Sequence, residues 1–256
     1  MRKLLIYLIF LFGALGLGYF AHQVKPDEFP ELLTIDTDYV ISYQEEGRFE
    51  VMMFTNQPSH ALFQKEEVLR VIMKDQITEV MFELSLLDIT QGTKEVYLHQ
   101  AWTKMIFGFR IPYFSDDIYL EDMTLSFELF DQQEYLIRLG KFSLYASYPL
   151  LDWTHLSGNK QEGELLSRLG TIYIGVSSEE FQIRSVAIGS MNDLRFTHME
   201  DELMITVPKE SFLLFNPSIH ITTEDGNEWI IHNFLYVIDH MLLKESGPLI
   251  NHYALY

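Results

Sequence analysis

The segment MTLSFEL, Met123–Leu129, decides the fold because apolar and polar residues alternate through it without a break. Met, Leu, Phe and Leu occupy every second position, and Thr, Ser and Glu lie between them. A period of two places the apolar side chains on one face of a β-strand and the polar ones on the other. The segment therefore predicts an antiparallel strand with one face in a core and the other in water.

The same alternation continues toward both ends of the chain. It recurs in Val80–Leu86, and also in Tyr39–Met53 on either side of the turn signal Glu45-Glu46-Gly47. In Tyr135–Tyr145 the apolar phase changes near Gly140, which predicts a β-bulge at that glycine. The first half of the chain thus reads as a series of antiparallel strands.

The second half repeats this pattern with shorter apolar runs. Alternating segments cover 172–176, 181–183, 203–207 and 219–221. Many short strands at regular spacing are typical of β-sandwiches and barrels. We predict a mainly β chain in which an N-terminal transmembrane helix precedes two antiparallel, immunoglobulin-like β-sandwich domains.

The predicted boundaries follow from breaks in the alternation. They are a signal anchor at 1–22, a spacer at 23–36, a first β-sandwich at 37–147, a linker or long loop at 148–168, a second β-sandwich at 169–250 and a C-terminal tail at 251–256. Two segments leave helix and strand as open alternatives. Residues 59–74 contain good helix formers, and residues 233–245 fit either a helix or, with preference, a strand that ends near Val237.

The N-terminus has the pattern of a membrane segment. Arg2 and Lys3 precede eighteen uncharged residues, Leu4–Ala21, and a helix of that length reaches about 27 Å, close to the thickness of a bilayer core. Positive residues before this segment and acidic residues after it predict that the remaining chain lies outside the cytoplasm. Cleavage as a signal peptide near Ala14-Leu15-Gly16 is the alternative, and it would release a secreted chain.

The composition restricts the classes of partner. The chain has a formal net charge of −19, and because Arg2 and Lys3 precede it, the segment 22–256 carries −21. Such a surface repels polyanions, which disfavours nucleic acid as a partner and disfavours docking on anionic lipid headgroups. The chain has no cysteine, so disulfides and lipid attachment through a thiol are excluded. Its 14% aromatic content indicates a folded body.

A search for catalytic motifs finds one weak match. Ser157-Gly158-Asn159-Lys160 resembles the Ser-x-x-Lys motif of penicillin-recognising enzymes, but no Lys-Thr-Gly motif accompanies it. Gly-Asn after the serine also favours a turn over the helix that the nucleophile requires. We therefore predict no catalytic residue.

Two acidic clusters contain the residue types of a metal site. His198 lies close to Glu200, Asp201 and Glu202, a spacing that suits a hairpin turn. Glu224–Glu228 offers carboxylate and amide oxygens, but it is shorter than a calcium-binding EF-hand loop, and its Asp-Gly pair is a strong hairpin signal. We predict no metal ligand and no cofactor.

Four aromatic residues lie outside the clean periodic segments and are candidates for an exposed partner contact. They are Trp102, Trp153, Tyr253 and Tyr256. Aromatic side chains are enriched at protein interfaces. Together with the predicted anchor, they suggest a surface that binds another protein of the cell envelope.

The function that these patterns favour is a membrane-anchored, extracytoplasmic and non-catalytic interaction module of the cell envelope. It would contact the membrane through residues 4–21 and a protein partner through loops or exposed strand edges. The alternatives are an envelope hydrolase, serine-based or metal-assisted, without a visible motif, and a ligand-sensing or transporter-associated domain.

Overall fold

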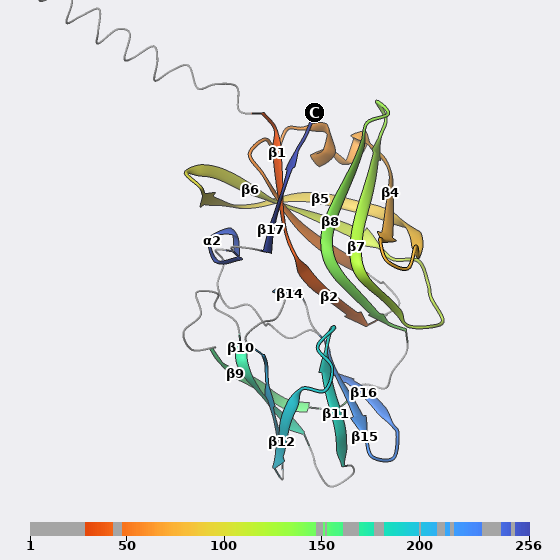
Figure 1. Ribbon diagram of the computed structural model, residues 1–256, viewed down its shortest axis with the longest axis vertical. Helices are drawn as coiled ribbons and strands as arrows, with labels where there is room; N and C mark the ends of the chain where they lie inside the picture. The colour runs from red at the N-terminus through yellow and green to blue at the C-terminus, as the bar shows by residue number, and fades with distance from the viewer. Residues whose placement is uncertain are drawn as a thin grey trace, which may run out of the picture.

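The structure, a computed structural model, describes residues 29–42, 48–146, 151, 153–160, 169–176, 182–199, 201–208, 213–215, 218–231, 242–246 and 249–256. These residues are mainly β and form three sheets (Figure 1). The predicted anchor, residues 4–21, lies outside the described residues. Within the described ranges, no helix is long and apolar enough to cross a bilayer.

Ten described strands form one sheet in the order β14-β2-β8-β7-β4-β5-β6-β3-β1-β17. Their bounds are β1 (Glu31–Ile35), β2 (Thr37–Ser42), β3 (Arg48–Thr55), β4 (Val68–Asp75), β5 (Met81–Tyr97), β6 (Gln100–Arg110), β7 (Ile118–Leu129), β8 (Glu134–Tyr145), β14 (Leu213–Phe215) and β17 (Ile250–Ala254). We call this part of the molecule the N-terminal unit.

Strand β7 shows why the sequence forms this sheet. Leu125 and Phe127 are fully buried, whereas Glu128 is exposed and Ser126 is half-buried. The strand predicted at Met123–Leu129 is therefore confirmed, with its apolar face in the core. Burial of such side chains contributes about 1.5–3 kcal/mol each.

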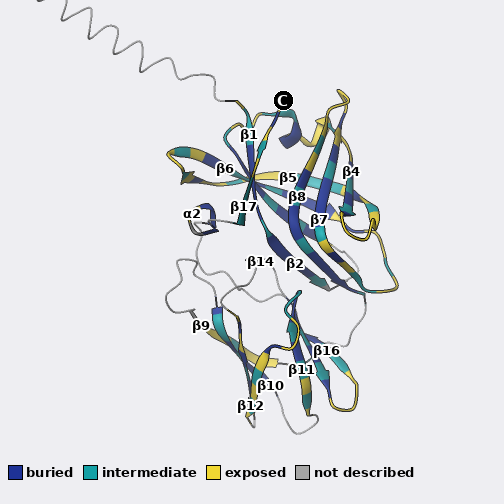
Figure 2. Cartoon of the chain, viewed as in Figure 1, coloured by how far each residue is buried: buried dark blue, intermediate teal, exposed yellow. Residues whose placement is uncertain are grey.

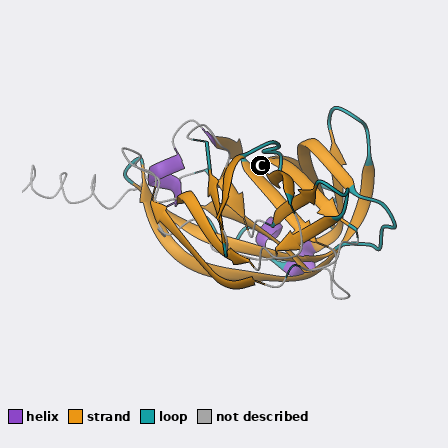
Figure 3. Ribbon diagram, turned by 90° about the horizontal axis from the view of Figure 1, so that it is seen from below, coloured by secondary structure: helices purple, strands orange, loops and turns teal. Residues whose placement is uncertain are grey.

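The long strand β5 allows the sheet to fold over a single core. Its first part pairs with β4, and from Ser85 onward it pairs with β6. The two halves of the sheet then face each other, and the rings of Phe107 on β6 and Phe127 on β7 lie 5.4 Å apart. Figure 2 shows buried residues along the strands of both halves, and Figure 3 shows the strands curving over one another in layers.

The chain crosses between the two halves at Asp36. Before it, β1 pairs antiparallel with β3 and β17, and after it, β2 pairs parallel with β8. The Asp36 carboxylate accepts hydrogen bonds from the Arg138 guanidinium at 3.0 and 3.2 Å and from the Asn251 side-chain amide at 2.8 Å. The prediction of purely antiparallel sheets is wrong here, because the chain changes sheet halves at Asp36 without a hairpin reversal.

The bulge predicted near Gly140 is confirmed. Met123 pairs with Gly140 and the next residue, Thr124, pairs with Arg138, so β8 carries one extra residue at this point. Gly140 has a φ of +115°, and a Cβ there would collide with the main chain of Thr37 at the start of β2. The bulge therefore allows β2 to begin its pairing beside β8.

The remaining strands form a second unit with two sheets around a separate core. The sheet β12-β13-β10-β9 and the sheet β11-β15-β16 share the buried side chains of Ile172, Val186, Ile205 and Ile221. The bounds of these strands are β9 (Trp153–Lys160), β10 (Leu169–Val176), β11 (Ile183–Ile188), β12 (Arg195–Met199), β13 (Glu202–Thr206), β15 (Ile219–Thr223) and β16 (Glu228–Ile231).

Three predicted boundaries are corrected by strand pairing. The spacer at 23–36 contains β1, and the linker at 148–168 contains all of β9. The predicted tail at 251–256 contributes most of β17, which pairs with β1 at the opposite end of the chain. β1 and β17 have five residues each and pair with each other across almost the whole chain, and most residues of β9 are polar, so local apolar alternation does not reveal these strands.

The two ambiguous segments have different outcomes. Residues 59–74 contain the 3₁₀ turns η1 (Ala61–Phe63) and η2 (Lys65–Glu67), and β4 follows directly. In the segment 233–245, residues 233–241 lie outside the described residues, and the short helix α2 (Leu242–Ser246) begins at its end.

The two units meet at a junction beside β2. The buried carboxylate of Asp38 accepts a hydrogen bond of 2.7 Å from the main-chain N–H of Ser190 in the β11–β12 connection. Val40 and Tyr145 of the N-terminal unit form a small apolar cluster with Ile230 of the second unit. Burial in this junction raises the pKa of Asp38 above its ordinary value of 3.8.

Gly140→Ala tests the importance of the bulge, and Gly226→Ala is a matched control. Both glycines have a positive φ, but nothing lies within 4 Å of a Cβ at Gly226. The control should lose about 1–2 kcal/mol of unfolding free energy from left-handed strain alone. Gly140→Ala should lose clearly more, because its Cβ also displaces β2. Urea unfolding measures both, and equal losses would refute the argument.

Asp38→Asn tests the buried charge at the junction. A raised pKa means that the charged carboxylate is less stable in the folded than in the unfolded chain, so its contribution to stability falls as pH rises above 3.8. The amide oxygen of Asn can still accept from Ser190. We expect the variant to be more stable than the parent at neutral pH, by roughly 1.4 kcal/mol per unit of pKa elevation. The difference should vanish well below pH 3.8, and an unchanged difference across this range would contradict the assignment.

Candidate binding groove

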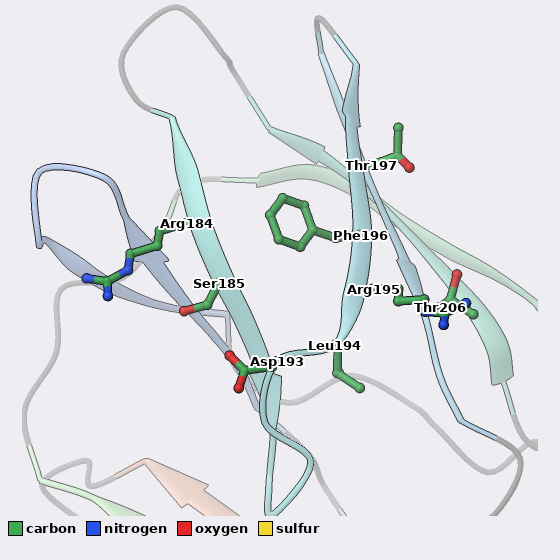
Figure 4. Close-up of a pocket in the computed structure, with 8 residues that line it drawn as sticks. All are labelled: Arg184, Ser185, Asp193, Leu194, Arg195, Phe196, Thr197 and Thr206. Carbon is green, nitrogen blue, oxygen red and sulfur yellow. The ribbon is translucent and has the colours of Figure 1, made fainter.

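A groove lies between strands β11 and β12 of the second unit, with a volume of about 640 Å³ (Figure 4). We call it the β11–β12 groove. Its lining residues come from both strands, from the connection between them and from β13, and they are Arg184, Ser185, Asp193, Leu194, Arg195, Phe196, Thr197 and Thr206.

The groove forms because two strands of one connection belong to different sheets. β11 pairs with β15 and β12 pairs with β13, so each is the edge strand of its own sheet. At the base of the groove they are still joined, since the N–H of Leu194 donates to the carbonyl oxygen of Val186 at 2.9 Å. Beyond this bond the two edges diverge and leave the groove between them.

The main chain of β12 is directed into the groove. In an antiparallel pair, successive residues direct their N–H and C=O groups alternately toward one neighbour and then the other. Because the N–H of Leu194 points to β11, the main-chain groups of Phe196 and His198 are directed to that same side. An edge of this kind is a template for pairing with another extended chain.

One apolar side chain enters the groove. The ring of Phe196 points into the space between the two strands and is half-buried against the core of the second unit (Figure 4). Arg184 and Arg195 are exposed and point away from each other. They therefore do not converge on a common anion, and they place positive charge on the two sides of the groove.

The lining residues do not form a catalytic arrangement. They include Ser185 and Asp193 but no histidine or lysine that could act as a base for the hydroxyl. The groove presents a strand edge, one aromatic ring and the guanidinium groups of Arg184 and Arg195 on its two sides. These features suit recognition of an extended peptide.

Of the two predicted contact tryptophans, one is exposed at a sheet edge and the other is buried. Trp153 is 45% exposed at the start of β9, at the edge of its sheet opposite to β12. Trp102 is only 2% exposed, so the expectation that it lies at the surface is wrong. Its ring packs with Leu242 and Leu243 of α2, and its indole N–H donates to the carbonyl oxygen of Tyr97 at 3.2 Å.

Tyr253 and Tyr256 lie together in a second pocket of about 350 Å³ between β8 and β17. The Tyr135 hydroxyl of β8 donates to the carbonyl oxygen of Tyr256 at 2.7 Å. In the opposite direction, the N–H of Arg138 donates to the Tyr253 hydroxyl at 3.0 Å. Tyrosine hydroxyls thus tie the C-terminal strand to β8, and Tyr256 remains 84% exposed.

The weak catalytic match takes part in the sheet. Ser157 and Lys160 lie in the extended strand β9, which pairs with β10. The turn that the sequence favours at this position is therefore wrong, and Ser157 does not open a helix as the nucleophile of that motif would.

The acidic clusters also have structural roles. Glu224–Glu228 forms the hairpin turn between β15 and β16, where the Asn227 side-chain amide donates to Asp225 at 2.7 Å. His155 lies 3.3 Å from the Glu202 carboxylate. In the part of the chain that the structure describes, no three His, Asp or Glu side chains converge as metal ligands would.

Phe196 is the residue that the sequence did not single out. Its segment, Arg195–Met199, is polar at most positions and lacks a clean apolar alternation. The available signal was a lone phenylalanine between an arginine and a threonine, and such a signal does not distinguish an edge strand from a loop.

No family model matches the chain, and no curated protein matches it. Solved structures with some similarity include SGBP-B of the Bacteroides ovatus mixed-linkage glucan utilization locus in complex with a mixed-linkage heptasaccharide, at 12% identity and a TM-score of 0.23. That alignment covers 74% of this chain and 38% of the other. This chain therefore spans well under half of that protein.

Two further structures are similar at the same low level. The YadV chaperone is 8% identical, with a TM-score of 0.21 over 80% of this chain and 99% of the other. The sialic acid binding region of a Streptococcus sanguinis SK1 adhesin, bound to 3'sLn, is 10% identical, with a TM-score of 0.19 over 81% and 77% of the two chains. Scores this low assign neither a family nor a ligand.

Proposed function

We propose that the chain is a membrane-anchored, extracytoplasmic interaction module of the cell envelope, without catalytic activity of its own. In this proposal the two β-units are immunoglobulin-like sandwiches. The crossing of the chain at Asp36 from one half of the sheet to the other supports that description, as does the sharing of β5 between the halves.

The observation that carries the proposal is the β11–β12 groove. A strand added there would pair with the main-chain groups of Phe196 and His198 and cover the Phe196 ring. Each added main-chain hydrogen bond contributes about 0.5–1.5 kcal/mol. Several such bonds and one buried ring amount to the affinity of a specific but reversible complex.

The charges beside the groove indicate the chemistry of the partner segment. In a chain of net charge −19, Arg184 and Arg195 place positive charge on both sides of the groove. Complementary charge fixes the register and orientation of a bound strand more than it raises affinity. An extended segment with an apolar residue for Phe196 and acidic residues on both sides fits this arrangement.

The rival function of an envelope hydrolase requires a nucleophile beside a base. The lining of the β11–β12 groove does not supply that pair, and Ser157 lies within the extended strand β9, not at the start of a helix. A ligand-sensing domain would need a more enclosed pocket than a groove between two strand edges. We therefore prefer the interaction module.

Photo-crosslinking in intact membranes tests this function. A photoreactive amino acid replaces Phe196 in one variant and Trp153 in another, since Trp153 lies on the opposite edge of the same sheet. We expect one dominant protein adduct from position 196 and much less from position 153. No adduct from position 196, together with hydrolytic activity of the purified chain, would favour the rival function.

A charge substitution measures the contribution of the ring. Phe196→Asp should weaken partner capture at least about tenfold, because a buried aromatic anchor commonly contributes 2 kcal/mol or more. Met199→Asp is the matched control, since Met199 is exposed on the same strand and points to the opposite face. Because Phe196 also packs on the core, unfolding curves and the milder Phe196→Ala separate lost binding from lost folding. Equal capture by both Asp variants would remove the groove from the mechanism.

A further inference from the structure

The hairpin of β5 and β6 extends beyond the sheet that supports it. The last residue of β6 that pairs with β3 is Thr103, opposite Thr55. The two hairpin strands continue past this point and still pair with each other, to Tyr97 and Gln100. Figure 1 shows the resulting projection at the left of the N-terminal unit. We call residues 94–101 the hairpin tip.

The tip exposes large apolar side chains. Val96 is 72% exposed and Leu98 is 69% exposed, and Ala101, directly opposite Val96, is exposed as well. In Figure 2 most of the tip is coloured as exposed or intermediate. Contiguous exposed apolar surface, in contrast to single scattered residues, marks contact sites.

The two residues of the turn adopt a backbone conformation that their side chains disfavour. Leu98 and His99 have φ values of +50° and +66°, a left-handed conformation that a two-residue hairpin usually assigns to Asn and Gly. A bulky residue pays a steric penalty in this conformation. Strain of this kind is retained where the side chain that it displays has a use.

The base of the hairpin keeps the tip extended. The main-chain N–H of Leu243 in α2 donates to the Glu95 carboxylate at 2.9 Å, and Glu95 is nearly buried. On the same face, the Trp102 indole donates to the carbonyl oxygen of Tyr97. Trp102, which the sequence suggested as a contact residue, therefore supports the contact surface from beneath.

The charge of this segment differs from that of the whole chain. Between Gln91 and Lys104 the sequence contains one acid, Glu95, and that acid is buried. Lys94 and His99 are exposed, and the Lys104 ammonium lies 5.9 Å from the centre of the Phe54 ring. The exposed surface of the tip is thus apolar and cationic on a protein of net charge −19.

We propose that the hairpin tip inserts into the interface of an anionic lipid bilayer. Val96 and Leu98 enter the boundary between headgroups and acyl chains, and Lys94 pairs with headgroup phosphate. Apolar side chains beside lysines are the combination by which interfacial segments bind anionic membranes. The acidic remainder of the protein is repelled by the same surface, which confines the contact to the tip.

The position of the tip agrees with this contact. Leu32 of β1 pairs with Thr55, which in turn pairs with Thr103 of β6. The chain therefore enters the fold, at Phe29, at the same end of the sheet from which the hairpin projects. If residues 4–21 anchor the chain, the body is tethered at the end of the sheet from which the tip projects. The contact does not depend on the β11–β12 groove.

Fluorescent labelling tests the insertion, because the absence of cysteine permits a single labelled position. Leu98→Cys carries an environment-sensitive fluorophore in the full chain, reconstituted into vesicles of phosphatidylcholine alone or of equimolar phosphatidylcholine and phosphatidylglycerol. Ile77→Cys is the matched control, since Ile77 is 67% exposed in the turn before the opposite end of β5. Lipids with a spin label on the acyl chain serve as quenchers.

We expect quenching at position 98 that increases with phosphatidylglycerol, and no quenching at position 77. Lys94→Gln should reduce the inserted population about fivefold, the effect of one lysine at an anionic surface. Lys74→Gln on β4 is its control. If the chain floats with the vesicles while the label at position 98 stays open to aqueous iodide, the tip does not insert and the proposal is wrong. Shielding that appears only when a protein fraction is added overturns it in the same way.

Leu98→Asn separates contact from folding. Asparagine tolerates the left-handed conformation and is polar. The variant should melt at the same or a higher temperature than the parent and yet lose the phosphatidylglycerol-dependent shielding of a label at Val96→Cys. Unchanged shielding in this variant would show that Leu98 makes no contact with lipid.

Discussion

The side chain of Asp36 connects the parts of the N-terminal unit that lie furthest apart in the sequence. It marks the point where β1 ends in one half of the sheet and β2 begins in the other. Arg138 on β8 and Asn251 on β17 both donate to its carboxylate, and Arg138 also pairs with Asp122 on β7. Because Asp36 is only 13% exposed, these bonds form in a partly dry environment where an ion pair is screened less than at the surface. The crossing of the chain, the closing C-terminal strand and the centre of the opposite half of the sheet thus depend on one carboxylate.

The order of the strands determines which strand edges are covered in each unit. In the N-terminal unit β17 lies along the edge of β1, β14 lies along the edge of β2, and tyrosine hydroxyls tie β17 to β8. In the second unit β11 and β12 separate after one main-chain bond, and each remains at the edge of its sheet. Uncovered edges favour association, and β11 and β12 are two such edges that lie beside each other across a groove, which makes this pair a candidate for binding. The groove is therefore a consequence of topology as much as of its side chains.

The sequence predicted the features that local alternation determines. The strand at Met123–Leu129, the bulge at Gly140 and the hairpin at Glu224–Glu228 each follow from residues within a few positions of one another. The strands β1 and β17 were missed because each has only five residues and they pair with each other from opposite ends of the chain, and β9 was missed because most of its residues are polar. The β5–β6 turn was missed because Leu98 and His99 are not turn residues, and the structure keeps them in strain. Trp102 was assigned to the surface because a tryptophan outside a periodic segment does not reveal that α2 covers it.

The net charge of the sequence did not reveal the candidate surfaces, because it is an average over the whole chain. A net charge of −19 describes a whole chain, and on that basis an anionic membrane is an unsuitable partner. Charge acts over roughly one Debye length, about 8 Å at physiological ionic strength, so a surface of a few residues responds to its own neighbours. The hairpin tip has buried its one acid against α2 and displays Lys94 beside Val96 and Leu98. The fold thus concentrates apolar and cationic groups at a projection, while the remaining surface keeps the negative charge that prevents other parts of the body from binding there.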